Sequence, residues 1–353
     1  MALEIKQNLN KEQWDSFLSQ FSEFNPFEQS FAWGDILLTE GKEVEKLALF
    51  EGNEHVAVAL VVYEKLPFGF KYAFSPKGPV IKMTNDQPCL PAGRFPMTNV
   101  VDVISQYLKD KKCVFWRIEP NIIQKSEFKN HKLVQVKDVN PSNTLILKLD
   151  KSYEEILSAM HSKTRYNIGL SKKKDLRVEE KKDLEIFWDL MKRTGERDAF
   201  RLHEKKHYEK VLNSEMVSQV IIYFENKPIA TGVFVRFGQT FTYLYGASDH
   251  EYRSLMAPYL VQDFGLNKAK KEGCANYDFF GIAPVVKGTD DEWVYDEKHQ
   301  YAGVTRFKLG FGGEYFKAPG TFEIPLKYRV YKIIKACLPV GRFIKFLRML
   351  LKK

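Results

Sequence analysis

A faint internal duplication limits what this chain can fold into more than any other feature of its sequence. Each half carries two apolar segments joined by a short turn, and then a third segment in which aromatic residues alternate with other residues. The segments are residues 47–50, 56–63 and 70–74 in the first half and 220–224, 229–237 and 241–245 in the second, about 170 residues later. The alternation at Phe70, Tyr72 and Phe74 is typical of a half-buried antiparallel strand. Three matching elements in the same order predict two copies of one β-rich unit.

Helical periodicity around these strands predicts that each unit is α+β. We expect helices at residues 11–21, 99–109, 153–160, 184–193 and 257–272, and further buried strands at 113–118 and 144–149. The domain boundary is therefore placed near Asp150, so that the first domain covers residues 1–150. A chain of 353 residues, 44% of them hydrophobic, is long enough for two ordinary cores. The predicted architecture is two tandem domains with mixed, largely antiparallel sheets and flanking helices.

The positive charge of the chain is concentrated at its C-terminal end. The net charge is +9, and after Glu323 the sequence contains nine Lys or Arg residues and no acidic residue. Apolar residues alternate with these charges, so residues 327–353 are expected to end in a basic amphipathic helix that binds an anionic membrane surface. The alternative is a terminal helix docked on its own domain with a solvated basic face.

The rest of the composition points to the cytoplasm. The N-terminal residues 1–14 are polar and lack the apolar region of a signal peptide. No uncharged apolar run reaches the roughly 18–20 residues of a spanning helix. The four cysteines show no metal-binding spacing. We expect a cytoplasmic monomer with no metal site, in peripheral contact with the inner face of the plasma membrane.

The order of strand, turn, small-residue strand and helix is the pattern of acyl-CoA N-acyltransferases (the GNAT fold), in which a glycine-rich loop binds the pyrophosphate of the cofactor. The matching loop here is Arg253–Pro258, and Met256 stands where glycine would let the backbone approach a pyrophosphate. We therefore expect neither coenzyme A nor another cofactor, and keep a CoA-dependent N-acyltransferase as the alternative.

A second motif spells a zinc site. His203-Glu204 and His207 match H-E-x-x-H, in which two histidines one helical turn apart bind zinc. The segment is strongly basic and no third ligand is identifiable, so a zinc metallopeptidase is kept only as a remote alternative.

A basic cluster lies just after the expected boundary. It contains Lys163, Arg165, Lys172 and Lys173, with Tyr166 between them, on an expected helix. Such a cluster is suited to the backbone of RNA, and we take it as a candidate tRNA-binding surface. The alternative is an ordinary solvated helix face.

Several short motifs together resemble the FemABX family of peptidoglycan-bridge peptidyltransferases, from about Gln29 to Pro325. The motifs are Gln29–Gly34, Lys65–Gly69, Pro76–Pro79, Lys163–Ile168, Tyr243–Ser248, Met256–Tyr259, Tyr277–Gly281, Ala302–Lys308 and Phe311–Gly313. The resemblance implies two tandem GNAT-like domains, an aminoacyl-tRNA donor, and a muropeptide acceptor linked to uridine diphosphate or to lipid. It also implies that the second domain covers residues 151–318 and that segment 319–353 returns to the first. Some members carry a coiled-coil arm near the place of residues 201–212, and the lack of a heptad run there indicates the compact, armless type.

The resemblance also suggests site residues. The family's Phe-Lys pair, whose lysine is implicated in transfer, is matched by Phe307 and Lys308 in an expected late strand, and an acidic residue considered as a base is matched by Glu119. A phosphate-contacting arginine and a tyrosine of the family align with His203 and His207. The remaining candidates for substrate binding are two arginines for phosphates and two tyrosines for the peptide, namely Arg201, Arg306, Tyr245 and Tyr259.

These expectations combine into one predicted function. The chain transfers an amino acid from aminoacyl-tRNA to the stem-peptide amine of a peptidoglycan precursor, either lipid II or UDP-MurNAc-peptide, and so builds the interpeptide bridge. Lys308 would stabilise the oxyanion of the tetrahedral intermediate from within a cleft, and Glu119 would accept the amine proton. A non-catalytic relative that binds RNA or a membrane surface is the other alternative.

Overall fold

The structure, a computed structural model, describes residues 3–22, 24–82, 97–121, 131–198, 200–288 and 292–337. The chain forms two compact units, one of residues 1–17, 41–140 and 319–353 and the other of residues 18–40 and 141–318. Residues 18–40 thus group with the second unit, whereas the sequence pattern placed them in the first. The reason is long-range bonding, as in the hydrogen bond of 2.8 Å that the Asn25 side chain accepts from the Gln239 amide.

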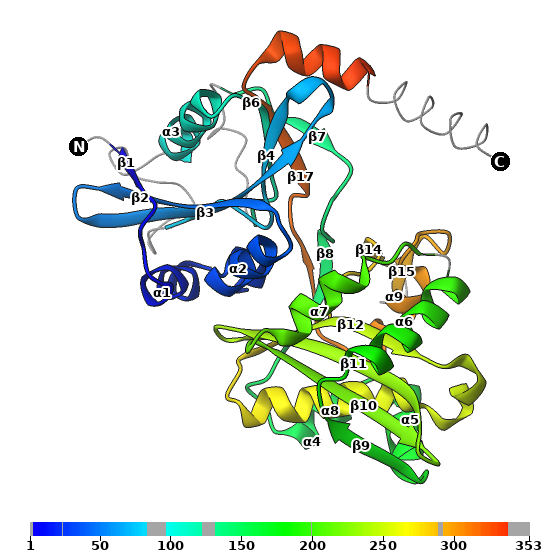
Figure 1. Ribbon diagram of the computed structural model, residues 1–353. Helices are drawn as coiled ribbons and strands as arrows, with labels where there is room; N and C mark the ends of the chain where they lie inside the picture. The colour runs from blue at the N-terminus through cyan, green and yellow to red at the C-terminus, as the bar shows by residue number, and fades with distance from the viewer. Residues whose placement is uncertain are drawn as a thin grey trace, which may run out of the picture. The chain divides into compact units, whose positions relative to one another are not determined.

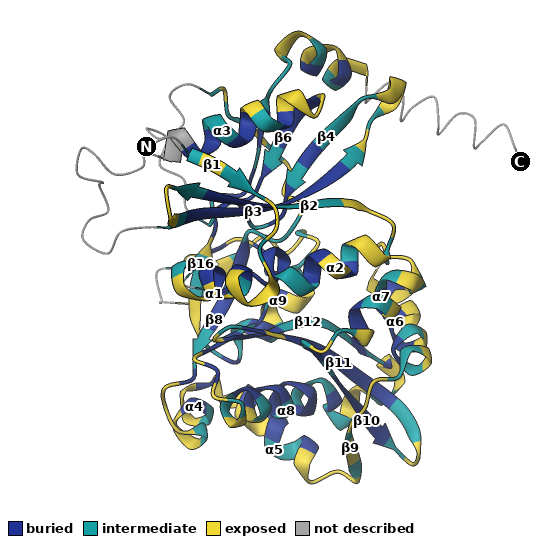
Figure 2. Ribbon diagram, turned by 60° about the vertical axis from the view of Figure 1, so that its left-hand side comes forward, coloured by how far each residue is buried: buried dark blue, intermediate teal, exposed yellow. Residues whose placement is uncertain are grey.

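The first unit is built on one mixed sheet. Its strand order is β1 (Leu3–Lys6), β2 (Glu43–Glu51), β3 (Glu54–Lys65), β4 (Lys71–Ser75), β6 (Cys113–Ile118), β17 (Thr321–Pro325) and β7 (Val134–Val136), and β5 (Val80–Ile81) also pairs with β3. Strand β3 is apolar almost throughout because it is buried on both faces, as its dark colour in Figure 2 shows. Helix α3 (Met97–Asp110) packs its apolar side against this core. Helix α1 (Lys11–Phe21) contains the chain boundary between the two units, which falls between Phe17 and Leu18.

The second unit repeats this plan. Its strand order is β16 (Glu314–Lys317), β8 (Asn143–Lys148), β13 (Asn276–Asp278), β12 (Thr240–Ser248), β11 (Lys227–Phe237), β10 (Val217–Phe224) and β9 (Leu176–Glu180). Helix α8 (Ala257–Lys271) lies on one face of the sheet, while α6 (Leu184–Asp198) and α7 (Lys205–Asn213) lie on the other (Figure 1). The apolar residues of α8 join the strands in a single hydrophobic cluster.

The two sheets share their topology, which confirms the predicted duplication. In the first unit β2, β3 and β4 are antiparallel neighbours and β4 pairs with β6 in parallel. In the second unit β10, β11 and β12 are antiparallel neighbours and β12 pairs with β13 in parallel. Both units therefore have the expected α+β, GNAT-like architecture.

Strand β12 has two irregularities that shape its surroundings. It pairs with β13 only up to Thr242, opposite Asp278, and then continues alone on that side to Ser248. Its register with β11 shifts after Tyr243, so that Leu244 is a bulge. Residues two apart on a regular strand share a face, but a bulge re-aims the chain. As a result Tyr243 packs into the cluster around α8, whereas Tyr245 contacts aromatic rings of α6 and α7.

The last described residues form a helix at 328–337 that docks on the first unit. Tyr331 and Ile334 are buried against Val114 and Phe115 of β6. For these residues the docked-helix alternative therefore applies. The rest of the expected basic helix lies outside the described residues, as does nearly all of a short C-L-P-x-G-R-F repeat at residues 89–95 and 337–343. No helix in the described ranges has the length and apolar character needed to cross a bilayer.

Candidate active site

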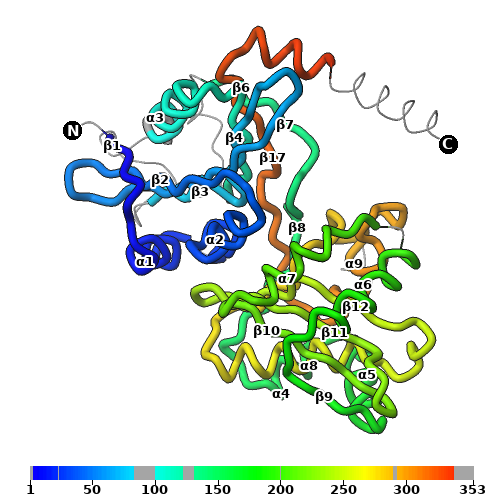
Figure 3. Tube along the Cα trace, in the orientation of Figure 1, coloured from blue at the N-terminus to red at the C-terminus, as the bar shows by residue number. Residues whose placement is uncertain are grey.

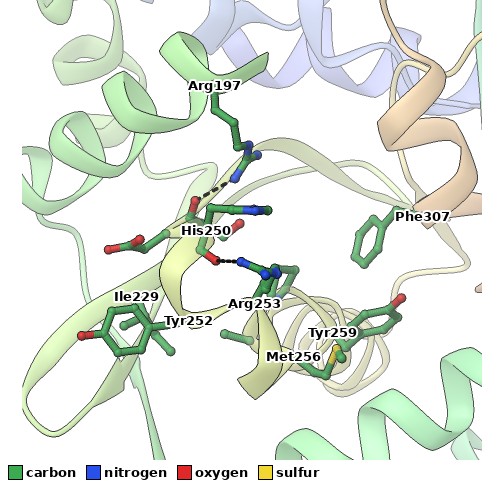
Figure 4. Close-up of a pocket in the computed structure, with 12 residues that line it drawn as sticks. Arg197, Ile229, His250, Tyr252, Arg253, Met256, Tyr259 and Phe307 are labelled. Atoms are coloured by element: carbon green, nitrogen blue, oxygen red, sulfur yellow. Dashed lines mark hydrogen bonds between the residues drawn. The ribbon is translucent and has the colours of Figure 1, made fainter.

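A hollow of about 120 Å³ lies at the start of α8 in the second unit (Figure 4). Tyr259 of α8 and Phe307 of α9 (Ala302–Leu309) line it, and their ring centroids are 5.1 Å apart in an edge-to-face arrangement. Arg197, at the end of α6, and Arg253, in the 3-10 turn His250–Leu255, line it as well. The hollow thus combines two aromatic faces with two guanidinium groups.

The two arginines differ in how far they are already engaged. Arg197 forms an ion pair of 2.6 Å with Asp198 and donates to the Ser248 carbonyl at 3.2 Å. Arg253 makes only a long contact of 3.5 Å to the His250 carbonyl, and no described carboxylate pairs with it. The Arg253 guanidinium is therefore the more available of the two for an anionic ligand.

Met256 occupies the position from which a glycine loop would contact a pyrophosphate. Its backbone is left-handed, with φ of 56°, and its side chain lines the hollow. The long side chain takes up the space that a pyrophosphate would need next to the helix start.

Lys308 lies on α9, not on the late strand that the resemblance suggested. Its side chain is only 7% exposed and does not line the hollow. The ammonium group donates to the Phe280 carbonyl and, at 2.9 Å, to the Gly281 carbonyl, in a turn where both residues have positive φ. It also lies 5.8 Å from the ring of Tyr243, next to the point where β12 and β13 part. The ammonium group is therefore buried, and Lys308 acts, if at all, from outside this hollow.

Burial has a large effect on the Lys308 amine. It lowers the pKa of Lys308 to about 7, against an opposing effect of the Asp278 charge. The amine is therefore close to its titration midpoint near neutral pH, and its two carbonyl contacts tie α9 to the turn at Phe280 and Gly281.

His207 connects a carboxylate to a phenol. Its Nδ1 is 2.6 Å from Glu40 Oε1, and its Nε2 is 2.9 Å from the hydroxyl of Tyr245. Glu40 caps the C-terminal end of α2 (Phe31–Thr39), so three separate elements meet here. The family motifs mark His207 and Tyr245 as candidates, but nothing in the sequence marks Glu40, which is 167 positions away from His207.

The geometry argues against a zinc site at the H-E-x-x-H motif. His203 precedes α7 instead of lying on it, and both ring nitrogens of His207 already have protein partners. The described residues contain no group of three or more His, Cys, Asp or Glu side chains arranged to hold a metal ion.

Glu119 belongs to the first unit and its carboxylate is already occupied. The side chain is 4% exposed and accepts hydrogen bonds from the Asn140 amide at 2.9 Å, the Asn140 side chain at 2.6 Å and Thr321 at 2.7 Å. The amides of Val139 and Lys77 approach it as well. Such an arrangement suits a structural carboxylate that joins three chain segments better than a free base.

The other predicted contacts are scattered over the surface. Arg306 and Arg201 are exposed, as are Lys163 and Lys173. On α5 (Ser162–Lys172), Arg165 donates to carbonyls of the preceding turn and Lys172 forms an ion pair of 2.9 Å with Asp263. Tyr166 is 67% exposed on the same helix. The structure thus brings Tyr259 and Phe307 together at the hollow, and joins His207 to Tyr245 by a hydrogen bond.

Comparison with known proteins shows which family this chain matches. The FemAB family matches the chain over residues 9–152, 131–215 and 214–337. The lipid II:glycine glycyltransferase of Staphylococcus epidermidis is 21% identical over 416 residues, which cover 95% of this chain and 96% of that protein. The Staphylococcus aureus protein of the same name is 22% identical over 413 residues, which cover 90% of this chain and 94% of that protein. These alignments are longer than this chain, so the relatives contain segments without a counterpart here, in agreement with a compact type.

Solved structures agree on the fold. The crystal structure of FemX superposes with a TM-score of 0.76 at 17% identity, over 94% of this chain and 99% of that chain. A tandem GNAT protein from the clavulanic acid biosynthesis pathway gives a TM-score of 0.55 at 9% identity, over 92% of this chain and 98% of that chain. Because the family match extends over nearly the whole length and the tandem fold agrees with it, the chain belongs to the FemAB family.

Proposed function

We propose that this chain is an aminoacyltransferase that moves an amino acid from aminoacyl-tRNA to the stem-peptide amine of lipid II. The observation that carries the proposal is the alignment, over at least 90% of both lengths, with relatives named lipid II:glycine glycyltransferases. The chain would thereby form the interpeptide bridge of peptidoglycan. A nucleotide-linked precursor is the second acceptor to be tested.

The hollow at the start of α8 is suited to the end of the tRNA donor. Aromatic side chains such as Phe307 and Tyr259 can stack on a terminal base, and the Arg253 guanidinium can bind a phosphate of the RNA backbone. An aminoacyl ester is already activated, so the enzyme has to position an amine against it and does not need a cofactor. The exposed Lys163 and Lys173 of the α5 region would contact the tRNA further along its backbone.

Lys308 is proposed to act by positioning and not by direct contact with the ester. Its carbonyl contacts hold α9 in place, and the neighbouring Phe307 lines the hollow. Glu119 is likewise proposed as structural, because its oxygen atoms are occupied by donors of the first unit.

The alternative of a CoA-dependent N-acyltransferase shares the GNAT-like fold with this proposal. Met256, which fills the place of the pyrophosphate-binding glycine, argues against it. A catalytically inactive relative would bind tRNA without transferring the amino acid.

A reconstituted reaction tests the proposed function. Charged tRNA is incubated with either lipid II or UDP-MurNAc-pentapeptide, and the muropeptide product is detected by mass spectrometry. We expect a product with lipid II that disappears when the charged tRNA is first treated with ribonuclease. Absence of transfer to both acceptors, or consumption of acetyl-CoA by the protein, would contradict the proposal.

A matched pair of variants tests the donor site. Arg253→Gln should raise the KM for charged tRNA about tenfold, as expected for loss of a charged hydrogen bond of about 1.5 kcal/mol. Arg236→Gln is the control, because Arg236 is half exposed in the same unit and does not line the hollow. Equal KM values for the two variants would remove Arg253 from the site.

A further inference from the structure

Glu40, His207 and Tyr245 form a continuous hydrogen-bonded chain inside the second unit. The carboxylate and the imidazole are 13% and 14% exposed at the side chain, and their contact is 2.6 Å. The Tyr245 hydroxyl lies 2.9 Å from the far ring nitrogen, and Tyr245 itself is partly exposed. The chain thus starts at a shielded carboxylate and ends at a partly exposed tyrosine.

The contacts fix where the histidine proton resides. A carboxylate only accepts hydrogen bonds, so the nitrogen facing Glu40, Nδ1, carries the hydrogen. In the neutral ring Nε2 is then unprotonated and accepts the hydroxyl hydrogen of Tyr245. The opposite tautomer would place a lone pair of Nδ1 against the carboxylate, which is repulsive. Carboxylate, imidazole and hydroxyl are therefore ordered as in a relay that withdraws a proton from the hydroxyl.

The surroundings keep this order intact. Rings of Trp33, Phe187 and Tyr208 pack around His207 and Tyr245 with centroids 5.3 to 6.4 Å away. The titratable neighbours are His203, whose ring centroid lies 4.3 Å from that of His207, Glu28 of the short helix Phe27–Gln29, and Arg201 beside His203. Burial raises the pKa of Tyr245, and Tyr208, Glu40 and Glu28 raise it further, so the phenol remains a neutral donor.

We infer that Glu40, His207 and Tyr245 are a proton relay for the transfer reaction, with the Tyr245 oxygen as the group that takes the proton from the acceptor amine. This inference rests on the proposed function. As the amine nitrogen forms its bond to the ester carbonyl, its proton passes to Tyr245 while the phenol proton passes to Nε2 of His207. When the ester C–O bond breaks, the same path returns one proton to the leaving ribose oxygen. Atoms and charge balance as amine plus ester giving amide plus alcohol.

In this scheme Tyr245 is the catalytic residue, and His207 and Glu40 are positioning residues that act through it. A single general base of this kind is typically worth about 100- to 10,000-fold in rate. Substitutions in the relay should leave the KM for charged tRNA unchanged, because none of the three side chains lines the hollow at the start of α8.

Kinetics of the full chain, with the charged tRNA and lipid II assay, test the relay. We expect kcat to fall at least 100-fold in Tyr245→Phe and in His207→Gln at unchanged KM for charged tRNA. In Glu40→Gln the acid limb of the kcat–pH profile should move to lower pH, which loss of packing alone would not cause. Tyr208→Phe is the matched control, because it removes a phenol that contacts the same rings but only accepts a hydrogen bond from the His203 amide. Its kcat should stay within about threefold of wild type.

A second measurement does not depend on the variants. Nitrogen NMR of histidine-labelled wild type should show Nδ1 of His207 protonated and Nε2 unprotonated in the neutral ring. The reverse tautomer, or wild-type kcat in Tyr245→Phe, would overturn the relay while leaving the transferase proposal intact. A wild-type protein that transfers nothing would overturn both.

Discussion

The buried amine of Lys308 makes stability depend on pH. Burial lowers the pKa of Lys308 to about 7 from 10.5, so unfolding takes up a proton at any pH between these values. The free energy of unfolding therefore contains a contribution that is constant below pH 7 and rises with pH above it, by about 1.4 kcal/mol per unit. Lys308→Met should lack this rise. Urea unfolding of both proteins at pH 6, 7.5 and 9 measures it, and parallel curves for the two proteins would contradict the burial of the amine.

Substitution of Glu119 tests whether its carboxylate has a structural or a catalytic role. Glu119→Gln replaces an acceptor-only group by an amide whose NH₂ must face one of two sets of donors, either Thr321 and the amides of Val139 and Asn140 or the Asn140 side chain and the Lys77 amide. We expect a loss of stability of about 2–4 kcal/mol from these unsatisfied donors, but a kcat for transfer within about threefold of wild type in the folded protein. A fall of 100-fold or more in kcat with unchanged stability would restore the general-base role.

Single residues also show where sequence reasoning stopped. Met256 and Tyr259 lie close together in sequence, within one recognisable loop and helix start, and the family's Phe-Lys motif identifies Phe307, so local motifs suffice to find all three. Glu40 was missed because its importance comes only from a contact with His207, and no periodicity reports such a distant pairing. The sequence predicts Lys308 as the residue that stabilises the oxyanion, but no motif reports its burial, which depends on packing against the turn at Phe280 and Gly281.

Among the elements, the start of α8 carries a local strain. Met256 adopts a left-handed backbone conformation, which costs a residue with a side chain about 1 kcal/mol or more. Met256→Gly should therefore change stability little or raise it by up to about 1 kcal/mol, even though the methionine side chain is removed. Thermal unfolding measures this change. Calorimetry with acetyl-CoA should show no binding to the wild type, and binding to Met256→Gly alone would show that this one side chain excludes the cofactor.

Strand β17 is fixed to the terminal helix by a buried carboxylate. Glu323 is fully buried and contacts Arg117 at 2.6 Å, Tyr331 at 2.8 Å and Lys335 at 2.8 Å. Burial alone would raise the pKa of Glu323, but hydrogen bonds from Lys335, Arg117 and Tyr331 lower it overall.

The lowered pKa of Glu323 predicts an acid-dependent stability. A depressed carboxyl pKa contributes stability that is present above pH 4.5 and is lost as pH falls through the folded-state value. Glu323→Gln should cost about 1.5–3 kcal/mol at pH 7, because the partly exposed cations Arg117 and Lys335 lose their charge partner, and the difference from wild type should shrink towards pH 3. Acid titration followed by circular dichroism checks this. A difference that stays constant with pH would show that packing, and not charge, holds the strand.

The duplicated strands were the elements that sequence predicted best. Their turns and apolar runs are local signals, and β2 to β4 and β10 to β12 confirm them, as α1, α3, α6 and α8 confirm the main helices. The bulge at Leu244 depends on the exact register between the neighbouring strands β11 and β12, and the insertion of β17 between β6 and β7 joins segments that are far apart in sequence. These features could not be read from periodicity, although the bulge decides which way Tyr245 points.

The charge distribution over the whole chain predicts that the protein binds an anionic membrane surface. The net charge of +9 equals the excess of basic residues after Glu323, and a lipid-linked acceptor would bring this segment to an anionic surface. The full chain should sediment with vesicles containing phosphatidylglycerol but not with phosphatidylcholine alone, and less strongly in high salt. Removal of residues 338–353 should weaken this binding at least tenfold. Equal binding of the truncated protein would assign the surface to another part of the chain.

The order of the segments in the first unit has a consequence for how the protein is made. That unit is completed by β17, which lies between β6 and β7 although it follows the entire second unit in sequence, as the orange strand beside the cyan ones shows (Figure 3). During synthesis on the ribosome, the second unit can finish folding before β17, the strand that pairs with both β6 and β7, has been made. An exposed strand edge of this kind invites pairing with other nascent chains, so a delay late in translation would be more harmful than one in the middle.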